Sequence, residues 1–393
     1  MPHYLTGFIC PRCGARYEGK GLYGVCRSCG GPLLAIYDLE AVRVRLDRRD
    51  LERRGPSMWR YRELLPVGSE ENIVSLGEGS TPLIKLERIS KELGLEVYLK
   101  DESRNPTGSF KDRAISATIS ALKEIGVRSV AMPTAGNAGA SLAAYAARAG
   151  FKAYIAMPKD TPRAIYAEIS IRGIDLSLVD GLISDAAKLV SEGSRIYGWI
   201  DVSTMKTPYR VEGTKTMAYE IAEQLRWRTP DAIIFPTGGG EGIVGMWKGF
   251  EELRTLGWID EIPRLIAVQS SGCKPIVDAY ERGAPDAEYY SGCTTLASGI
   301  RVPKPFGDRE ILRAIRETKG YAIAVSDQEI VDAMKKLASI EGILPCPEGA
   351  ASYAALLKLV ERGFLSRGET IVIFNSGSAL KYFEVISNLA RVV

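Results

Sequence analysis

Histidine is almost absent from the 393-residue sequence, in which His3 is the only one. A single histidine near the start argues against Ser-His-Asp and Cys-His catalysis, and it excludes a histidine-rich catalytic metal site. The sequence also lacks any run of about 18 apolar residues, so it predicts no transmembrane helix and no membrane partner. The first six residues lack a basic segment followed by an apolar one, which predicts no secretory signal. We therefore expect a cytoplasmic protein.

Neither sign of charge dominates, because 51 basic residues stand against 48 acidic ones. This balance argues against nucleic acid as the main partner, although it leaves a local basic patch open. No Gly-Lys-Ser or Gly-Lys-Thr occurs, so the sequence has no Walker loop. The length predicts two to three domains.

Four of the seven cysteines form two close pairs, Cys10-x-x-Cys13 and Cys26-x-x-Cys29, which are separated by twelve residues. In a long cytoplasmic chain this spacing favours metal binding over disulfides. Four thiolates around one ion are typical of a closed, structural zinc site with no position for a substrate. Iron is the alternative, since four cysteines can hold either metal.

The cysteine spacing and the composition divide the chain into three parts. Residues 1–37 are a zinc-ribbon module, which is too short to fold without its ion. Residues 38–70 are a charged connector in which residues 38–54 are expected to form a helix, and residues 71–393 are the main body. The remaining three cysteines are expected to be buried core thiols: Cys273, Cys293 and Cys346.

The main body alternates short apolar runs with helical patterns, which predicts an α/β fold with parallel sheets covered by helices. In such sheets, ligands bind beyond the carboxyl ends of the strands. The predicted strands are Val97–Lys100, Ser129–Met132, Ala153–Met157, Leu176–Val179, Ala232–Phe235, Leu265–Gln269 and Thr370–Phe374.

The stretch Asn105-Pro106-Thr107-Gly108-Ser109-Phe110-Lys111-Asp112-Arg113 joins one of these strands to a helix expected over Asp112–Ile125. Lys111 therefore stands beside unpaired backbone N–H groups, at the positive end of the helix dipole. An ammonium is disfavoured there, which lowers the lysine pKa and makes the amine a usable nucleophile or covalent partner. The alternative is an ordinary solvated lysine in a first turn.

Residues 236–245, Pro-Thr-Gly-Gly-Gly-Glu-Gly-Ile-Val-Gly, also follow a strand and begin a helix. Their N–H groups can converge on a phosphate. The segment contains a literal G-x-G-x-x-G, which would indicate a dinucleotide site. That site needs an acidic residue at the end of the next strand, but Leu265–Gln269 is followed by two serines.

Two further strand-to-helix turns carry small and polar residues, at residues 133–141 and 374–381. Taken alone, the first is a tight turn with Asn137 as a helix cap. Together with Gly77-Glu78-Gly79-Ser80-Thr81-Pro82-Leu83, Pro208-Tyr209-Arg210-Val211-Glu212-Gly213, residues 298–303 and residues 346–352, these segments resemble the threonine synthases. The N-terminal ribbon resembles that of one branch of this family.

The resemblance implies a pyridoxal 5'-phosphate (PLP) enzyme of fold type II, in which two parallel-sheet α/β domains enclose the active site. It implies that Lys111 carries the cofactor covalently and that Asn137 hydrogen-bonds its phenolic oxygen. The hydroxyl of Ser376 would face the pyridine nitrogen. The phosphate loop would comprise Gly238, Gly239, Gly240, Glu241 and Gly242.

This sequence departs from the family pattern at two of these positions. Glu241 places an anion in the phosphate loop, so its side chain is expected to point away from the bound phosphate. Ala379 stands where the family usually has glycine.

The resemblance implies conversion of O-phospho-L-homoserine and water into L-threonine and phosphate, with Lys111 as the general base, in a homodimer. Thr134 and Lys188 are candidate ligands of the substrate phosphate. Within the same fold, an ammonia-lyase acting on threonine or serine, or a phosphoserine-using synthase such as cysteate synthase, stays open. A zinc-ribbon nucleic-acid binder is the alternative outside the enzymes.

Overall fold

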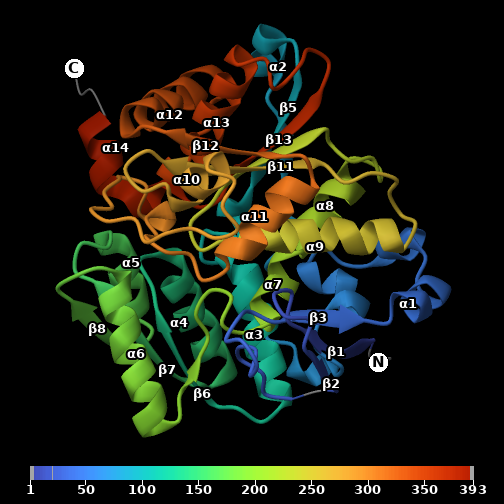
Figure 1. The fold of residues 1–393 in the computed structure, drawn as a ribbon, viewed down its shortest axis with the longest axis vertical. Helices are drawn as coiled ribbons and strands as arrows, with labels where there is room; N and C mark the ends of the chain where they lie inside the picture. The colour runs from blue at the N-terminus through green and yellow to red at the C-terminus, as the bar shows by residue number, and fades with distance from the viewer. Residues whose placement is uncertain (1–3, 20, 390–393) are drawn as a thin grey trace.

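A computed structural model describes residues 4–19 and 21–389, so His3 lies outside the described residues. The described chain forms three sheets (Figure 1). A small antiparallel sheet near the N-terminus lies beside α7 and α9, and the two larger sheets belong to the main body. No helix among the described residues is long and apolar enough to cross a membrane.

The N-terminal sheet has the strand order β2-β1-β3 and holds the four paired cysteines in its turns. Its strands are β1 (Leu5–Ile9), β2 (Arg16–Glu18) and β3 (Leu34–Tyr37). Phe8 and Leu34 are buried, and they join the same hydrophobic core as the main body. The ribbon is therefore packed on the body rather than tethered to it.

The prediction of a single helix over residues 38–54 is wrong. Helix α1 (Leu39–Arg45) ends at Leu46, whose backbone is extended, and a separate 3-10 helix, η1 (Arg48–Arg53), follows. The Asp47 side chain accepts a hydrogen bond from the Arg49 N–H at 2.9 Å. A side chain that bonds nearby backbone in this way starts a new helix instead of continuing the old one. Two more 3-10 helices complete the connector, η2 (Met58–Leu64) and η3 (Glu70–Asn72).

The larger body sheet has the order β12-β11-β10-β13-β5-β4, and only β4 runs antiparallel to its neighbour. Its central strands are apolar on both faces, as expected for a parallel sheet covered by helices. Its strands are β4 (Leu83–Lys85), β5 (Glu96–Asp101), β10 (Ala232–Pro236), β11 (Arg264–Ser270), β12 (Tyr321–Val325) and β13 (Thr370–Asn375).

The smaller body sheet is fully parallel, with the order β8-β7-β6-β9. It lies with α4, α5 and α6 at the lower left of Figure 1. Its strands are β6 (Ser129–Pro133), β7 (Lys152–Pro158), β8 (Asp175–Val179) and β9 (Ile200–Asp201). Every strand predicted from the sequence is therefore present, and both body sheets are of the predicted α/β type.

Most helices follow the strands of these two sheets, so many helix N-termini lie close to strand carboxyl ends. The helices of the body are α2 (Glu87–Leu93), α3 (Lys111–Glu124), α4 (Asn137–Ala149), α5 (Arg163–Ser170), α6 (Ile183–Tyr197), α7 (Tyr209–Thr214), α8 (Thr216–Gln224), α9 (Glu241–Thr255), α10 (Pro275–Glu281), α11 (Asp308–Glu317), α12 (Asp327–Glu341), α13 (Pro347–Glu361) and α14 (Phe383–Leu389), with the 3-10 turns η4 (Glu102–Arg104), η5 (Ser298–Ile300) and η6 (Ala379–Tyr382).

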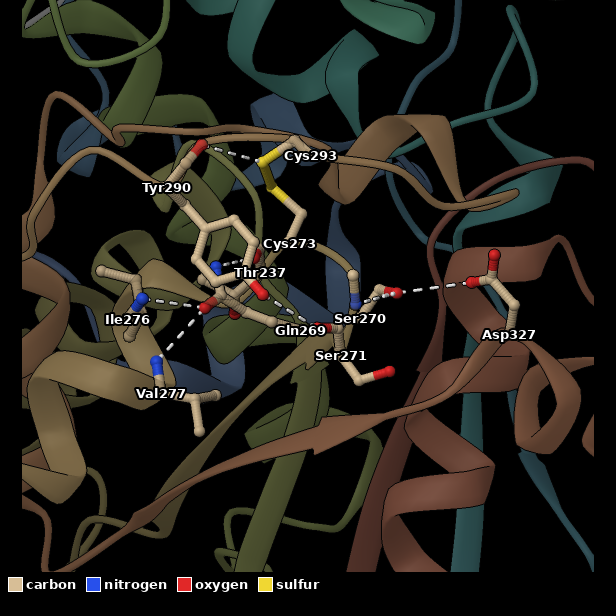
Figure 2. Close-up of a disulfide and its surroundings, with 11 residues drawn as sticks. Thr237, Gln269, Ser270, Ser271, Cys273, Ile276, Val277, Tyr290, Cys293 and Asp327 are labelled. Carbon is tan, nitrogen blue, oxygen red and sulfur yellow. Dashed lines mark hydrogen bonds between the residues drawn. A yellow bond between two sulfur atoms is a disulfide. The ribbon is translucent and has the colours of Figure 1, made fainter.

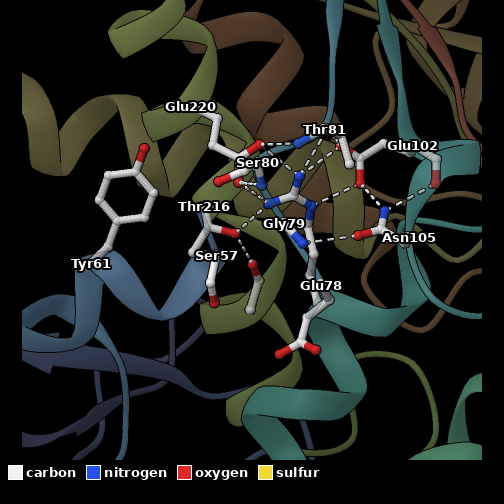
Figure 3. A network of polar contacts seen from close by, with 12 residues as sticks. Ser57, Tyr61, Glu78, Gly79, Ser80, Thr81, Glu102, Asn105, Thr216 and Glu220 are labelled. Atoms are coloured by element: carbon white, nitrogen blue, oxygen red, sulfur yellow. Dashed lines mark hydrogen bonds and ion pairs between the residues drawn. The ribbon is translucent and has the colours of Figure 1, made fainter. Parts of the chain in front are cut away.

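A buried network of charges ties the start of α3 to η4 and α8. The fully buried Arg113 guanidinium donates to Glu102 at 2.7 Å and to Glu220 at 2.6 Å. Figure 3 shows the two carboxylates on either side of Thr81, whose hydroxyl donates to Glu102. Since a buried charge is costly unless it is paired, these contacts hold the first turn of α3 in one place.

The expectation that all three scattered cysteines are free thiols is wrong for two of them. Cys273 and Cys293 form a disulfide (Figure 2), which joins the loop after β11 to the segment leading to η5. Gln269, at the end of β11, accepts hydrogen bonds from the Ile276 and Val277 N–H groups and holds the same loop. The sequence did not predict this pair because the two thiols meet only through the tertiary fold. Cys346 is a buried free thiol, as predicted.

Candidate active site

A cleft of about 250 Å³ lies where the carboxyl ends of strands from both body sheets meet. The larger sheet contributes the turns after β10 and β13, and the turn that leads from β5 to α3. The smaller sheet contributes the turns after β6 and β9. The strand order places β10 next to β13 and β13 next to β5, so three of these turns lie side by side.

Lys111 is the first residue of α3, as the sequence predicted within one residue, and it lines this cleft. The turn before it is fixed by Asp112, whose carboxylate accepts from the Thr107 N–H at 2.6 Å and from the Thr107 hydroxyl at 2.5 Å. Gly108 has a φ of +70°, which favours glycine at this position. The Lys111 side chain is 20% exposed, and its ammonium lies 4.2 Å from the centre of the Phe110 ring.

Glu241 forms an ion pair with Lys111, and its buried carboxylate also binds Arg210 through two hydrogen bonds of 2.6 and 2.8 Å. Burial disfavours the charge on Glu241, but the cations Arg210 and Lys111 outweigh it and lower the carboxyl pKa to about 2. Burial lowers the pKa of Lys111, and attraction by Glu241 offsets only part of this effect. The expected low lysine pKa is thus supported, with burial as the larger cause.

The Glu241 carboxylate points toward Lys111 and Arg210, and its direction relative to a bound phosphate stays a prediction. The carboxylate is turned inward, because Arg210 supplies a fixed cation inside the protein. The segment around Arg210 resembles the family, but by itself it predicts no role for this side chain. Helix α7 also contains Glu212, so its local sequence gives no signal that singles out Arg210.

The glycine loop between β10 and α9 has no room for side chains. A Cβ at Gly240 would lie 2.2 Å from Ile311 Cδ1, and one at Gly239 would lie 2.7 Å from Thr204 Cγ2. Gly240 also has a φ of +88°. The loop therefore presents bare backbone at the N-terminus of a fifteen-residue helix, which suits an anion such as a phosphate.

Asn137, Thr134 and Ser376 line the same cleft from the turns after β6 and β13. The Asn137 Oδ1 atom is buried and has no hydrogen-bond partner, so it is available to a polar ligand. The Ser376 Oγ lies 3.7 Å from the Cys346 Sγ. The Thr134 hydroxyl accepts a hydrogen bond from the Gly136 N–H at 3.1 Å and donates one to the Gly136 carbonyl at 3.2 Å, so it is bonded within the turn.

Lys188 does not lie in the cleft, so the structure does not support its predicted contact with a substrate phosphate. Its side chain is 80% exposed and its ammonium pairs with Asp185 at 2.9 Å. Helix α6 turns Ser184 and Ala187 toward the cleft, and the next residue after Ala187 lies about 100° further around the helix. Lys206 and Lys304 line the cleft in its place.

Glu348 is a second carboxylate in the cleft lining that sequence reasoning placed only in a helix first turn. It accepts from the Gly299 N–H at 2.7 Å and from the Tyr382 hydroxyl at 2.6 Å. Glu348 therefore holds η5 against α13 and shapes this wall of the cleft.

The four paired cysteines meet at one point of the ribbon, with their sulfur atoms within 4.8 Å of one another. The Cys10 and Cys29 sulfurs are 3.4 Å apart, and those of Cys13 and Cys26 are 3.6 Å apart. A Zn–S bond of 2.3 Å in a tetrahedron sets sulfur atoms about 3.8 Å apart, so the arrangement fits one such ion. In each turn the glycine that follows the second cysteine donates its N–H to the carbonyl of the first cysteine. Gly14 donates to Cys10 and Gly30 donates to Cys26.

The ribbon contacts the body at a residue that lines the cleft and at helix α7. The Arg12 guanidinium donates to Glu310 at 2.9 Å and to the carbonyl of Phe306, which lines the cleft, at 2.7 Å. The Tyr209 hydroxyl, next to Arg210, donates to the Gly21 carbonyl at 2.5 Å. The ribbon that holds the four cysteines is thus packed against the wall of the cleft, although the cysteine sulfur atoms do not line the cleft.

Comparison with known proteins identifies the class of this protein. Residues 74–377 match the family of pyridoxal-phosphate-dependent enzymes, and the chain belongs to that family. The threonine synthase of Methanocaldococcus jannaschii is 41% identical over 374 residues, which cover 95% of this chain and 92% of that protein. The threonine synthase of Methanosarcina acetivorans is 38% identical and covers 95% of this chain and 91% of its own. The resemblance inferred from the motifs is confirmed.

Solved structures confirm the predicted fold type. A threonine deaminase isoform from Solanum lycopersicum has a TM-score of 0.69 at 22% identity and covers 88% of this chain and 95% of its own. Maize serine racemase has a TM-score of 0.68 at 23% identity and covers 78% and 92%. Similarity at this level shows the fold and does not distinguish between reactions.

Proposed function

We propose that this protein is a threonine synthase, which converts O-phospho-L-homoserine and water into L-threonine and inorganic phosphate. The observation that carries the proposal is its identity of 38 to 41% with two threonine synthases over nearly the whole chain. The cleft supports it, since a partly buried lysine of lowered pKa lines the same cleft as a glycine loop suited to a phosphate.

The residues around the cleft fit pyridoxal phosphate. The bare glycine loop would hold its phosphate, Lys111 would bind its aldehyde carbon, and the side-chain N–H of Asn137 would donate to its phenolic oxygen. Ser376 would face its ring nitrogen with a hydroxyl, which does not force a proton onto that nitrogen as a carboxylate would. When bound, the cofactor supplies the electron sink that stabilises negative charge next to the substrate amine.

Lys111 is the only proton carrier that this mechanism requires of the chain. Its buried amine can take a proton at Nζ and return it, because burial lowers its pKa toward the working range. Glu241 keeps the amine over the glycine loop through their ion pair. Lys206, Lys304 and Thr134 line the cleft and are candidate ligands of the substrate phosphate. The Lys206 ammonium pairs with Asp201 and that of Lys304 with Asp308, so each would exchange a carboxylate for the phosphate.

We propose further that Cys10, Cys13, Cys26 and Cys29 hold one structural zinc ion. The sulfur geometry supports a tetrahedral ion, and the four thiolates leave no coordination position for a substrate. The division into a ribbon (1–37), a connector (38–70) and a body (71–393), the homodimer and the cytoplasmic location belong to the same proposal.

A product assay tests the reaction. The purified protein loaded with PLP should release phosphate from O-phospho-L-homoserine and form an equal amount of threonine. Parallel incubations with threonine, serine and O-phosphoserine should release neither ammonia nor phosphate at a comparable rate. Ammonia release from threonine or serine would indicate a lyase, and phosphate release from phosphoserine alone would indicate a different synthase.

A further inference from the structure

Glu241 has a position that the general chemistry of the cofactor does not require. It is an acidic residue beside the loop proposed to hold a phosphate. A carboxylate and a phosphate are both anions, and neighbouring like charges repel strongly in a buried site. Yet the Glu241 carboxylate is 1% exposed and turned toward Lys111. A buried anion at this position needs a cation to neutralise it.

Arg210 is the compensating cation. Its buried guanidinium grips both Glu241 oxygens, at 2.6 and 2.8 Å, and donates to the Val202 carbonyl at 2.7 Å. This two-point grip fixes the plane of the carboxylate, as bidentate arginine pairs do. The Oε1 atom that accepts from Arg210 Nη2 is the one that also accepts from the Lys111 ammonium.

We propose that Glu241, held by Arg210, is a positioning residue that keeps the Lys111 amine at the glycine loop, and that its charge sets the pH at which Lys111 takes up pyridoxal phosphate. The lysine amine must lose its proton before it can attack the cofactor aldehyde, and Glu241 would then retain the Arg210 partner. The carboxylate is then neutralised internally, so it need not oppose the incoming phosphate.

The charged groups around Lys111 give the direction of the effect. They are Glu241 from α9, Arg210 from α7 and Glu348 from α13. Burial and Arg210 disfavour the ammonium, whereas the two carboxylates favour it. Removing the charge of Glu241 takes away the nearest anion and leaves Arg210 unopposed, so the Lys111 pKa falls further. The free amine then exists at lower pH.

The test measures how fast the cofactor-free full chain binds added PLP covalently, by the absorbance of the bound cofactor, from pH 5 to 9. We expect Glu241→Gln to move the midpoint of this pH profile downward by about one unit, which makes attachment about ten-fold faster at a pH below both midpoints. The ionisation of PLP itself is common to all variants, so it does not affect the comparison.

Glu252→Gln is the matched control, because Glu252 is another buried carboxylate of α9 that pairs with lysines, Lys215 and Lys248, away from the cleft. Its midpoint should equal that of the unaltered protein. An unchanged midpoint in Glu241→Gln, or an equal shift in Glu252→Gln, would overturn the proposal.

If the Glu241→Gln protein does not fold, the Glu241→Asp variant is tested in its place. Its shorter carboxylate stays within reach of Arg210 and lies farther from Lys111. A smaller downward shift is expected, and an unchanged midpoint overturns the proposal. The inference rests on the cofactor of the family and not on the threonine synthase reaction, so failure of the product assay leaves this test intact.

Discussion

Lys111, Glu241 and Arg210 place three charges in one buried corner of the cleft. Such a group persists only because each charge is satisfied, and removing one partner of a buried pair typically costs about 3–5 kcal/mol. Sequence reasoning identified Lys111 because a strand, a turn and a helix start are local features. It gave no role to Arg210, since its contact with Glu241 spans 31 positions and depends on how α7 packs against α9.

The first prediction at this scale concerns Lys111 itself. Borohydride reduction of the PLP-loaded protein, followed by peptide mapping, should place the cofactor label on Lys111. The physical reason is that this amine is buried beside the glycine loop with a lowered pKa. Lys206→Ala, which removes another cleft lysine, should label as the unaltered protein does. A label on any other lysine contradicts the assignment.

The second prediction concerns the substrate phosphate. Lys206→Ala should raise the KM for phosphohomoserine by about ten-fold, roughly the contribution of one charge-assisted hydrogen bond. Lys206 lines the cleft, and its ammonium is held at 2.9 Å from Asp201, the last residue of β9. Lys188→Ala is the matched control and should leave KM unchanged, because that ammonium faces solvent. Steady-state kinetics with both variants measure the two KM values. An unchanged KM in Lys206→Ala would contradict the assignment of Lys206.

At the scale of elements, the ribbon and the connector show what local patterns can and cannot predict. The two Cys-x-x-Cys turns were recognisable because metal ligands recur at fixed spacing, and their sulfur atoms meet as expected. The break at Leu46 was missed because Asp47 acts as a new helix cap within an otherwise helical charge pattern. The Cys273–Cys293 pair was missed because disulfide partners cannot be derived from spacing alone.

Loss of one ribbon thiolate should affect stability much more than chemistry. We expect the unaltered protein to contain about one zinc ion per chain, and Cys26→Ser to lose it, since three thiolates no longer close the tetrahedron. Metal analysis and thermal unfolding measure the two effects. The ribbon should unfold at a lower temperature while the PLP absorbance of the body persists. A folded Cys26→Ser protein without catalysis would show that the ion is more than structural.

The disulfide should stabilise the wall of the cleft. It closes a loop with a sequence separation of 20, for which the chain-entropy relation gives about 3 kcal/mol. The double change Cys273→Ser with Cys293→Ser should therefore lower the midpoint of urea unfolding. A reductant should lower the midpoint of the unaltered protein in the same way and leave the double variant unaffected. Equal midpoints in all four samples would contradict a stabilising bond.

At the scale of the whole molecule, the cleft exists because two separately formed sheets bring their strand ends together. Alternating strands and helices predicted the α/β class and the location of each motif at a strand end. The same pattern did not predict that β5 would join the larger sheet beside β13, because that pairing links residues about 270 positions apart. The relative placement of Asn137 and Lys111 was therefore available only through the family resemblance.

This division between two sheets leads to the last prediction. If the cofactor is held by the glycine loop of the larger sheet and by Asn137 of the smaller one, loading PLP should slow amide hydrogen exchange in α9 and also in α4, since a ligand bound to both parts opposes their local opening. Exchange followed by mass spectrometry measures both helices in one experiment. Asn137→Ala should keep the protection gained in α9 and lose most of that gained in α4. Protection of α9 alone in the unaltered protein would mean that the larger sheet holds the cofactor by itself, and Asn137 would have no part in binding it.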